Sequence, residues 1–367
     1  MPGSDGKIRY AVIAGGFISQ DAFMPGVAQT PNSVMTALVT GDPVKADKLA
    51  GHYGLKSYSY DQYATLLASG EIDAVYVATP NFAHLDFVVA ALQAGIHVLL
   101  EKPMSSSEEE CKAMIEASQR STAKLMIAYR LHCEPGTLEM IERVRAGDFG
   151  DPRLFTSTFT QTVPASNHRI KHGFAAGPVM DMAPYPLNML RQLFADEPIE
   201  VSAVGVTSPG SPLDTPDTVT VSLRFPQERL AQFTVSYSLP SSERFQLLGT
   251  KGGIEAAPCF GYGDGVGITY RATIDGETKE HAHPVVDQFA GETAYFSDCI
   301  LNDLTPEAGA DEGWRDVRIL AAIKRALDTG QTQTLEPLPL KRLPGKDQLR
   351  QLPLVKGPAL IDAQSPN

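Results

Sequence analysis

The stretch IRYAVIAGGFIS, residues 8–19, decides how the chain begins to fold. It starts as an apolar run typical of a buried strand and passes into a glycine turn that opens a helix. Glycines at such a turn let backbone N–H groups approach an anion, whose charge the helix N-terminus favours. A complete dinucleotide-binding motif would have glycine at position 14 and glycine or alanine at position 19, where this chain has Ala14 and Ser19. The position of the turn after the first strand therefore indicates a phosphate site, with a tight turn that binds nothing as the alternative. The residues expected at this site are Gly15, Gly16, Phe17 and Ile18.

Outward from this stretch, short apolar runs alternate with helical patterns up to about residue 130. Strands are expected at VMTALVTG, IDAVYVATP, IHVLL and AKLMIAY, with helices between them. Strands that are apolar on both sides and separated by helices are typical of a doubly wound parallel sheet, because helices cover both of its faces. Residues 1–130 are therefore predicted to form a nucleotide-binding Rossmann domain.

The rhythm changes from about residue 152. PRLFTSTFTQTV, DTVTVSLRF and LAQFTVSYSLP alternate polar and apolar residues without long helices between most of them. This alternation is typical of an antiparallel sheet with one covered face. Residues 131–340 are predicted to form an α+β domain with a large open sheet, whose second face is either solvated or an oligomer interface. Residues 341–367 are rich in proline and are predicted to be an extended tail.

Composition argues against two classes of main partner. The net charge of −12 argues against nucleic acid and anionic membranes, which would repel an acidic surface. The four cysteines are far apart and form no CxxC pair, which is typical of reduced thiols. No secretory signal or membrane-spanning run is visible, so a cytoplasmic protein is expected. The histidine pairs at 168 and 172 and at 281 and 283 lack further nearby ligands, so no metal is expected.

The end of the second predicted strand bears on the choice between NAD and NADP. An acidic residue usually stands there and binds the ribose 2′-OH of NAD. This chain has the neutral Thr40 followed by Gly41, and Lys45 lies on the next predicted helix. A hydroxyl and a nearby ammonium suit a 2′-phosphate, so NADP is favoured. NAD stays possible, because Asp42 could bind the ribose after a small shift.

A lysine between a glutamate and a proline ends the apolar run in HVLLEKPM, residues 97–104. A solvated surface pair would explain these residues alone. Together with YAVIAGGFISQDAFMPG, IDAVYVATPNFAH, KLMIAYRLH, PVMDMAPYPLN and EGWRDVRILAAIKRAL, however, the chain resembles the Gfo/Idh/MocA oxidoreductase family from about Lys7 to Thr334. Within it, the chain is most similar to the glucose–fructose oxidoreductase branch.

The resemblance implies roles for residues of both predicted domains. Lys102 is expected beside the nicotinamide and the reacting carbinol, and Glu101 at the nicotinamide ribose. The loop that touches the ribose and pyrophosphate is matched by Thr79, Asn81 and His84. Arg130 is expected near the nicotinamide. The residues expected to border the substrate are His132, Arg169, Lys171 and Tyr185.

The family's remaining catalytic residues usually read Asp-x-x-x-His, and this chain has Asp181 and Tyr185 at that spacing. A phenol can transfer the carbinol proton if its ordinary pKa near ~10 is lowered, which the charge of Lys102 could do. Asp181 would orient the substrate or the lysine. Pro184 and Pro186 flank the tyrosine and disfavour the helical state of the residue before each, so this helix is expected to be kinked or to start late.

The predicted function is NADP(H)-dependent hydride transfer between nicotinamide C4 and a sugar or sugar-like carbinol or lactol. A redox-sensing regulator that binds the nucleotide without turnover is one alternative, although it would not need Lys102, Asp181 and Tyr185. A glycosidase that oxidises its substrate transiently is another. A homodimer or homotetramer joined through the second sheet is expected.

Overall fold

The computed structural model describes residues 6–339 and 343–365, which divide into two compact units. Unit 1 contains residues 6–133, 286–314 and 348–365, and unit 2 contains residues 134–285 together with 315–339 and 343–347. The sequence predicted that each domain is one continuous stretch, divided at residues 130 and 340. This was wrong, because each unit contains separate stretches of the chain. The chain returns to unit 1 after the second sheet, because helix α9 (Gln288–Leu301) packs against strands of the first sheet. Part of the expected tail belongs to unit 1 as well.

Unit 1 is built on a six-stranded parallel sheet with the order β3-β2-β1-β4-β5-β6. Its strands are β1 (Ile8–Ile13), β2 (Ser33–Val39), β3 (Lys56–Tyr58), β4 (Ala74–Val77), β5 (His97–Glu101) and β6 (Leu125–Ala128). The predicted Rossmann sheet is confirmed. The short β3 was missed, since its residues are polar and half-exposed and give no apolar run. Parallel pairing brings the carboxyl ends of all these strands to one edge of the sheet.

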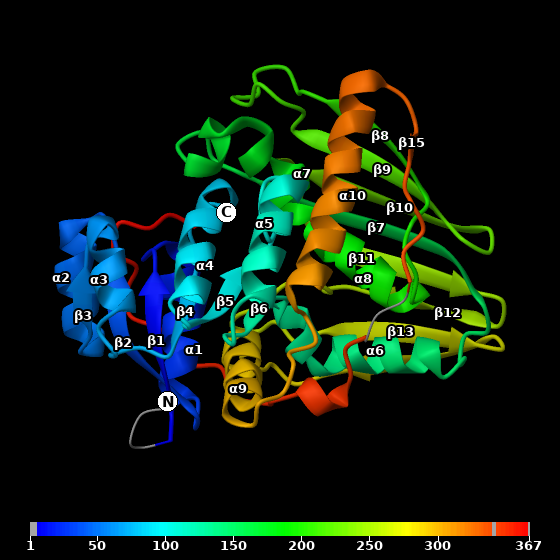
Figure 1. The fold of residues 1–367 in the computed structure, drawn as a ribbon. Coiled ribbons are helices and arrows are strands. Elements are labelled where there is room, and N and C mark those ends of the chain that lie inside the picture. The colour runs from blue at the N-terminus through cyan, green and yellow to red at the C-terminus, as the bar shows by residue number, and fades with distance from the viewer. Residues whose placement is uncertain (1–5, 340–342, 366–367) are drawn as a thin grey trace. The chain divides into compact units, whose positions relative to one another are not determined.

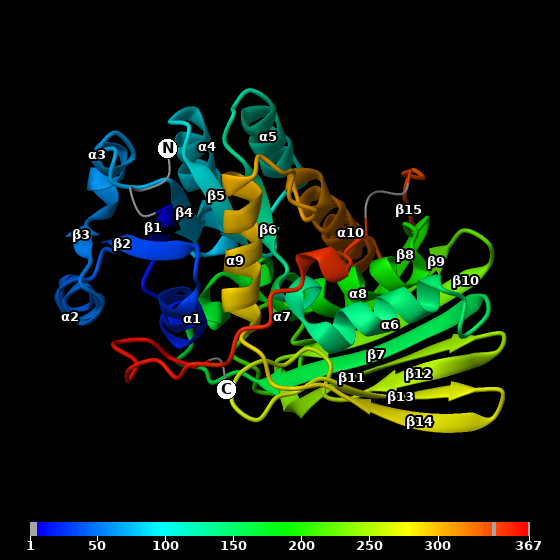
Figure 2. The same ribbon diagram turned by 90° about the horizontal axis from the view of Figure 1, so that it is seen from below.

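Helices cover both faces of this sheet, with α1 and α9 on one face and α4 and α5 on the other (Figures 1 and 2). The α-helices that lie wholly in unit 1 are α1 (Met24–Gln29), α2 (Pro43–Tyr53), α3 (Tyr63–Leu67), α4 (His84–Gln93), α5 (Glu108–Gln119) and α9. A π-helical turn (Ser19–Phe23) precedes α1. The 3-10 turns are η2 (Tyr60–Gln62), η3 (Asn81–Ala83), η4 (Arg130–Cys133) and η7 (Lys346–Gln348).

Unit 2 is built on a nine-stranded sheet with the order β14-β13-β12-β11-β7-β10-β9-β8-β15. Its strands are β7 (Pro152–Thr162), β8 (Glu200–Val206), β9 (Thr218–Phe225), β10 (Arg229–Ser236), β11 (Ser238–Gly249), β12 (Gly252–Ala256), β13 (Thr269–Ile274), β14 (Glu277–Ala282) and β15 (Gln333–Thr334). Neighbouring strands run antiparallel except β7 and β10, which pair in parallel. The predicted large, mainly antiparallel sheet is confirmed.

One face of this second sheet is covered by helices (Figure 1). The helices of unit 2 are α6 (Pro135–Arg145), α7 (Pro178–Met182), α8 (Pro184–Phe194) and most of α10 (Ala310–Thr329), with the 3-10 turns η5 (His168–Lys171) and η6 (Gly173–Ala176). The expected kink is confirmed, because the helix breaks at Ala183 and restarts with Pro184 in its first turn. Proline is tolerated there, since the first turn of a helix needs no backbone N–H bond.

A buried ion network joins α8 to α10 within unit 2. Arg191 donates to the carboxylates of Glu197, at 2.7 Å, and Asp316, at 2.6 Å, and Arg315 donates to Glu197 at 2.9 Å. Burial tends to raise the pKa of Glu197, but the two arginines outweigh it and lower that pKa below its usual value. Each buried charge therefore has a partner of opposite sign, which is the condition under which such a network is tolerated.

Candidate active site

In the glycine turn after β1, two carbonyl groups accept hydrogen bonds from side chains. Ser19 Oγ donates to the carbonyl oxygen of Ala14 at 2.7 Å, and Gln20 Nε2 donates to that of Gly15 at 2.8 Å. Ala14 has a φ of 76°, the left-handed conformation that glycine would adopt without strain. A side chain on Gly16 would meet nothing within 4 Å, so its backbone is open to a ligand. These features fit a dinucleotide phosphate, which needs accessible N–H groups at a helix N-terminus.

The predicted 2′-phosphate residues lie beside this turn. Thr40 and Gly41 follow β2, and the aliphatic part of Lys45 lies against the turn, with Cδ 3.8 Å from the position that a Gly15 Cβ would occupy. The Lys45 ammonium forms no ion pair with any residue in the described part of the chain. Asp42 caps α2, because its Oδ1 accepts from Val44 N at 2.9 Å and Lys45 N at 3.2 Å. The carboxylate that could have favoured NAD is thus engaged by the helix.

Glu101 and Lys102 stand where β5 ends. Tyr76 of β4 donates to Glu101 Oε1 at 2.6 Å and thereby fixes the carboxyl group. Burial raises the pKa of Glu101, although the Tyr76 bond and the charges of Lys102 and Arg130 oppose this. Lys102 therefore leaves the sheet edge next to a buried carboxyl group that the Tyr76 hydroxyl fixes.

The serines and glutamates after Lys102 organise the start of α5. Ser107 caps the helix by accepting from Glu110 N at 3.2 Å, and Ser105 and Ser106 donate to the Glu110 carboxylate. The acidic first turn suits the positive end of the helix dipole. The polar run that follows the lysine thus holds the segment in place.

His84 contacts the loop that contains Thr79 and Asn81 and holds it in place. Its ring is 1% exposed, with Nε2 2.8 Å from the carbonyl oxygen of Thr79 and Nδ1 3.1 Å from that of Met104. Burial lowers the pKa of His84, although the neighbouring carbonyl groups oppose this. The histidine therefore links the loop after β4 to the segment after Lys102. Its expected direct contact with the cofactor stays a prediction.

Arg130 and His132 are both buried within unit 1. Arg130 donates to Gln288 on α9 and lies 5.8 Å from the centre of the Phe289 ring. His132 Nδ1 lies 2.9 Å from Glu307 Oε2, and its ring stacks on Tyr129. The structure places His132 in a closed polar contact of unit 1, and its expected place at the substrate stays a prediction.

Glu292 was missed by sequence reasoning. It lies on α9, is 1% exposed, and neither of its carboxyl oxygens has a hydrogen-bond partner among the described residues. Burial raises its pKa well above the usual value, and the neighbouring Glu101 raises it further, while Arg130 opposes both. The only hint in the sequence was a glutamate between the apolar residues that α9 repeats around it, Phe289, Ala290, Ala294 and Tyr295.

Asp181, in unit 2, is held by two donors. Arg169 Nε lies 3.1 Å and the Tyr237 hydroxyl 2.7 Å from its Oδ2 atom. Burial raises the pKa of Tyr237 well above its usual value, and the charge of Asp181 adds to this, so the phenol stays a donor. Tyr237 was missed by sequence reasoning, although it continues the alternation of Phe233 and Val235 toward the covered face of β10.

Tyr185 lies in the first turn of α8, beside an aromatic wall. Its ring meets Phe159 edge-on, with centroids 5.3 Å apart, and Phe260 at 6.1 Å. Lys171 in η5 is exposed. Arg169, Asp181 and Tyr185 therefore all lie in unit 2, where Arg169 binds Asp181. The residues predicted for the nucleotide all lie in unit 1.

Family models match both parts of the chain. Residues 8–129 match the model described as "Oxidoreductase family, NAD-binding Rossmann fold", and residues 137–255 match the Gfo/Idh/MocA C-terminal domain. The chain is 30% identical to the D-xylose 1-dehydrogenase [NADP(+)] of Haloarcula marismortui over 342 residues, which cover 91% of this chain and 94% of that one.

Solved structures agree with these matches. The aldose-aldose oxidoreductase from Caulobacter crescentus, complexed with glycerol, is 32% identical, with a TM-score of 0.84 and coverage of 90% of this chain and 100% of that one. A levoglucosan dehydrogenase in complex with NADH and L-sorbose shares the fold at 20% identity, with a TM-score of 0.79, covering 90% of this chain and 100% of that one.

The chain belongs to the Gfo/Idh/MocA oxidoreductase family. The prediction of an NAD(P)-dependent oxidoreductase acting on CH–OH groups is thereby confirmed, and with it the nicotinamide cofactor. Within residues 6–339 and 343–365, no three His, Cys, Asp or Glu side chains are grouped so that they could hold a metal ion. The same residues contain no helix that is long and apolar enough to cross a membrane.

The buried Glu292 predicts a pH dependence of stability. Its pKa is raised in the folded protein, so above about 4.5 the unfolded chain releases a proton that the folded chain keeps. The contribution of this group to stability is therefore present at low pH and is lost as pH rises toward the folded pKa, by about 1.4 kcal/mol per pH unit. Glu292→Gln should flatten this slope and stabilise the protein at pH 7.

Urea unfolding of both proteins between pH 4.5 and 7.5 measures this difference. Glu116→Gln, which alters an exposed glutamate of α5, should leave the slope unchanged. Parallel curves for the wild type and Glu292→Gln would contradict the assignment of a raised pKa to Glu292.

Proposed function

We propose that this chain is an NADP(H)-dependent oxidoreductase that transfers a hydride between nicotinamide C4 and a carbinol or lactol carbon of an aldose-like sugar. The observation that carries the proposal is the position of Glu101, fixed by Tyr76, and of the adjacent Lys102 at the end of β5, in the same sheet whose first strand leads into the glycine turn. The relatives named for D-xylose and aldose oxidoreduction support the sugar. Lys45 beside the turn supports NADP over NAD.

The chain's own residues would do the following in sugar oxidation. Gly15 and Gly16 offer backbone N–H groups to the phosphates, and Glu101 accepts from ribose hydroxyls. Tyr185 takes the proton from the substrate hydroxyl as the C–H bond breaks, and Lys102 donates a hydrogen bond to the same oxygen. When bound, the nicotinamide supplies the acceptor for the hydride, or its donor in the reverse direction.

Asp181 is a positioning residue in this scheme. Its carboxylate is engaged by Arg169 and Tyr237, so it orients the loop and helix around Tyr185. Buried donors around a carboxylate fix its direction and hold its charge. Lys171 and His132 remain candidates for polar contacts with the sugar. A glycosidase of the same family would differ by releasing an aglycone from an aryl glycoside, which a colorimetric assay detects.

Cofactor choice should depend on Lys45. Lys45→Ala removes the ammonium that faces the 2′-phosphate, so the Kd for NADPH should rise by about tenfold or more, the effect of a charged hydrogen bond. The Kd for NADH should change little, because NADH has no such phosphate. Lys48→Ala, which removes an exposed lysine of the same helix, should leave both unchanged. Fluorescence titration of the wild type and both variants measures these Kd values, and equal losses for NADPH and NADH with Lys45→Ala would rule out this role.

Proton transfer should depend on the Tyr185 hydroxyl. Tyr185→Phe should bind NADPH normally and lose about 10²–10⁴-fold in kcat, the usual contribution of a general acid or base. Lys102→Ala should lose at least as much. The two losses should not multiply in the double variant, because groups that act on one atom are non-additive.

Steady-state oxidation of D-xylose and D-glucose by each variant gives these values. Tyr53→Phe is the matched control, since the Tyr53 hydroxyl has no hydrogen-bond partner in the described chain. Near-full activity of Tyr185→Phe on an accepted sugar would show that the proton passes elsewhere, and His132 or Asp181 would then be tested.

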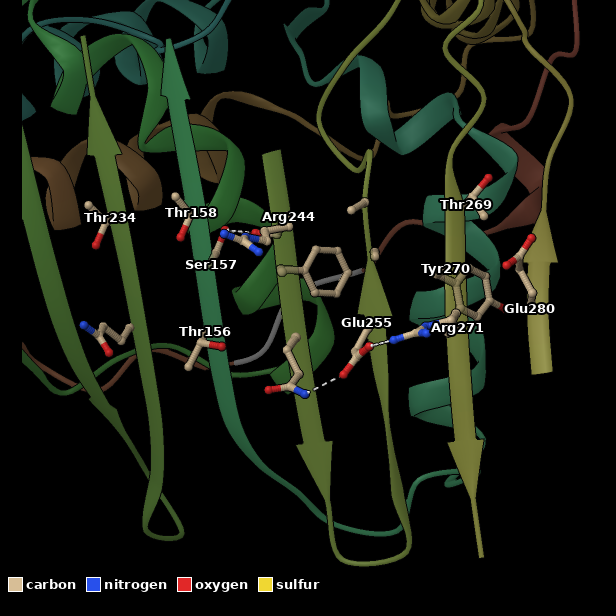
Figure 3. A pocket seen from close by; sticks show the side chains of 15 residues that line it. Thr156, Ser157, Thr158, Thr234, Arg244, Glu255, Thr269, Tyr270, Arg271 and Glu280 are labelled. Carbon is tan, nitrogen blue, oxygen red and sulfur yellow. Dashed lines mark hydrogen bonds and ion pairs between the residues drawn. The ribbon is translucent and has the colours of Figure 1, made fainter. Parts of the chain in front are cut away.

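The uncovered face of the unit 2 sheet is the proposed oligomer interface. Cross-strand neighbours on β10, β7 and β11 form three rows there, Leu230–Leu154–Leu248, Gln232–Thr156–Gln246 and Thr234–Thr158–Arg244. Leu230 and Leu248 are 54% and 40% exposed. A polar hollow of about 660 Å³ is lined by residues that include Thr156, Thr158, Thr234, Arg244 and Glu255. Figure 3 shows these side chains. An apolar row next to two polar rows suits pairing with a second copy through the same face.

Light scattering at micromolar concentration should therefore report a dimer or tetramer. Leu230→Asp should shift the protein toward the monomer, because it puts a charge into the apolar row. Leu304→Asp is the control, since Leu304 is 53% exposed but lies in unit 1. A monomeric wild type would refute the interface.

A further inference from the structure

The C-terminal arm, residues 348–365, is held to unit 1 by specific bonds although it lies almost entirely outside regular secondary structure. Gln348 donates to Glu307 Oε2 at 3.3 Å, and Arg350 donates to Asp298 Oδ2 at 2.8 Å. Further along, the carbonyl oxygen of Leu352 accepts from the backbone N–H of Asp287 at 2.9 Å. Figure 2 shows the arm, in red, running beside α9 and past α1. It is therefore a docked segment of unit 1.

The arm packs closely against unit 1 at two glycines, Gly291 and Gly357. A Cβ on Gly291 of α9 would lie 2.9 Å from the carbonyl oxygen of Arg350. A Cβ on Gly357 would lie 2.7 Å from Pro25 Cγ and 3.1 Å from the carbonyl oxygen of Gln20. Contacts this close leave no room for a side chain at either position. The arm is thus fitted to α9 at one glycine and to the start of α1 at the other.

Gln20 joins the arm to the phosphate turn. Its side chain is buried, and Nε2 donates to the carbonyl oxygen of Gly15 at 2.8 Å and to that of Ile361 at 2.9 Å. Its Oε1 atom accepts from the backbone N–H of Ile361 at 2.7 Å. A primary amide has two donors and an acceptor, so this one group binds both segments at once. The orientation of the Gly15 peptide group and the seat of the arm therefore depend on the same side chain.

We propose that the C-terminal arm is a strap that fixes the phosphate turn through Gln20 and so slows the release of the nucleotide. Gln20 is a positioning residue in this arrangement. When the arm is seated, the Gln20 amide is immobilised from both sides and holds the Gly15 carbonyl away from the phosphates. Without the arm, Gln20 gains rotational freedom and the turn loses the preorganisation that favours the bound state. The proposal rests on the nucleotide site of the proposed function.

The release rate of NADPH tests this directly. The protein is loaded with NADPH and mixed with excess NADP+, and the loss of nicotinamide fluorescence is followed by stopped flow. A chain that ends at Val355 keeps the bonds of Gln348, Arg350 and Leu352 but loses Gly357 and Ile361. We expect it to release NADPH about tenfold faster, the factor that corresponds to losing one or two neutral hydrogen bonds.

Two point variants test the Gln20 amide and the docking of the arm separately. Gln20→Met keeps the volume and removes the amide, and Gly357→Val keeps Gln20 but blocks the seat of the arm on Pro25. Both should speed release to about the rate of the shortened chain, and combining Gln20→Met with the shortening should add little, because all three changes unseat one strap. A chain that ends at Ser365 and the exposed substitution Gln351→Met should behave as the wild type.

The release rates show whether the arm acts on the turn through Gln20. An unchanged release rate in the chain that ends at Val355 overturns the strap, even if Gln20→Met speeds release, since Gln20 would then act on the turn alone. Losses that multiply in the combined variant overturn it as well. If the wild type binds no nicotinamide nucleotide, the proposed function fails together with the strap. Should Gln20→Met not fold, Gly357→Val and the shortened chain still give the answer.

Discussion

The backbone of the turn at residues 14–16 is the constraint on which unit 1 depends, because an anion site made of N–H groups requires carbonyl groups that point elsewhere. In this chain Ser19 and Gln20 bind those carbonyls. The two departures from the dinucleotide-binding motif are therefore linked. Ala14 takes the left-handed conformation that glycine would take, and Ser19 supplies the hydroxyl that holds the Ala14 carbonyl. A local strain of order 1–2 kcal/mol is offset by a bond that a glycine or alanine at position 19 could not make.

The repeating patterns of the sequence were sufficient to predict both sheets. The order of apolar and polar residues along a strand indicates whether one or both of its faces are buried. The site was predicted only in part. The partners of Asp181 are separated from it by 12 and 56 positions, so no local pattern could reveal them. The roles of His84 and Glu292 depend likewise on the elements that cover them. The unit boundary was wrong for the same reason, since the return of α9 to the first sheet is a tertiary contact.

Among the tyrosines of unit 2, Tyr237 bonds to Asp181, and Tyr185 has aromatic neighbours. The raised pKa of Tyr237 commits its hydroxyl to donate to Asp181, and Arg169 balances the charge of that carboxylate. Asp181 is thus engaged on the side of Tyr237 and Arg169. Tyr185 lies in the first turn of α8, and its ring contacts the ring of Phe159 edge-on. A sugar presents apolar C–H faces as well as hydroxyl groups, so a tyrosine beside an aromatic wall is suited to contact both.

A chain with a net charge of −12 must still attract a nucleotide that carries several phosphates. The charges near the turn reconcile these facts. Asp42 directs its carboxylate to the N-terminus of α2, where the helix amides balance it. Burial raises the pKa values of Glu101 and Glu292, and the charge of Arg130 opposes this in both. Lys45 makes no ion pair among the described residues. The groups beside the turn that suit a phosphate are therefore the backbone N–H groups and the Lys45 ammonium. Exposed charges elsewhere on the acidic chain are screened over about 8 Å at physiological salt.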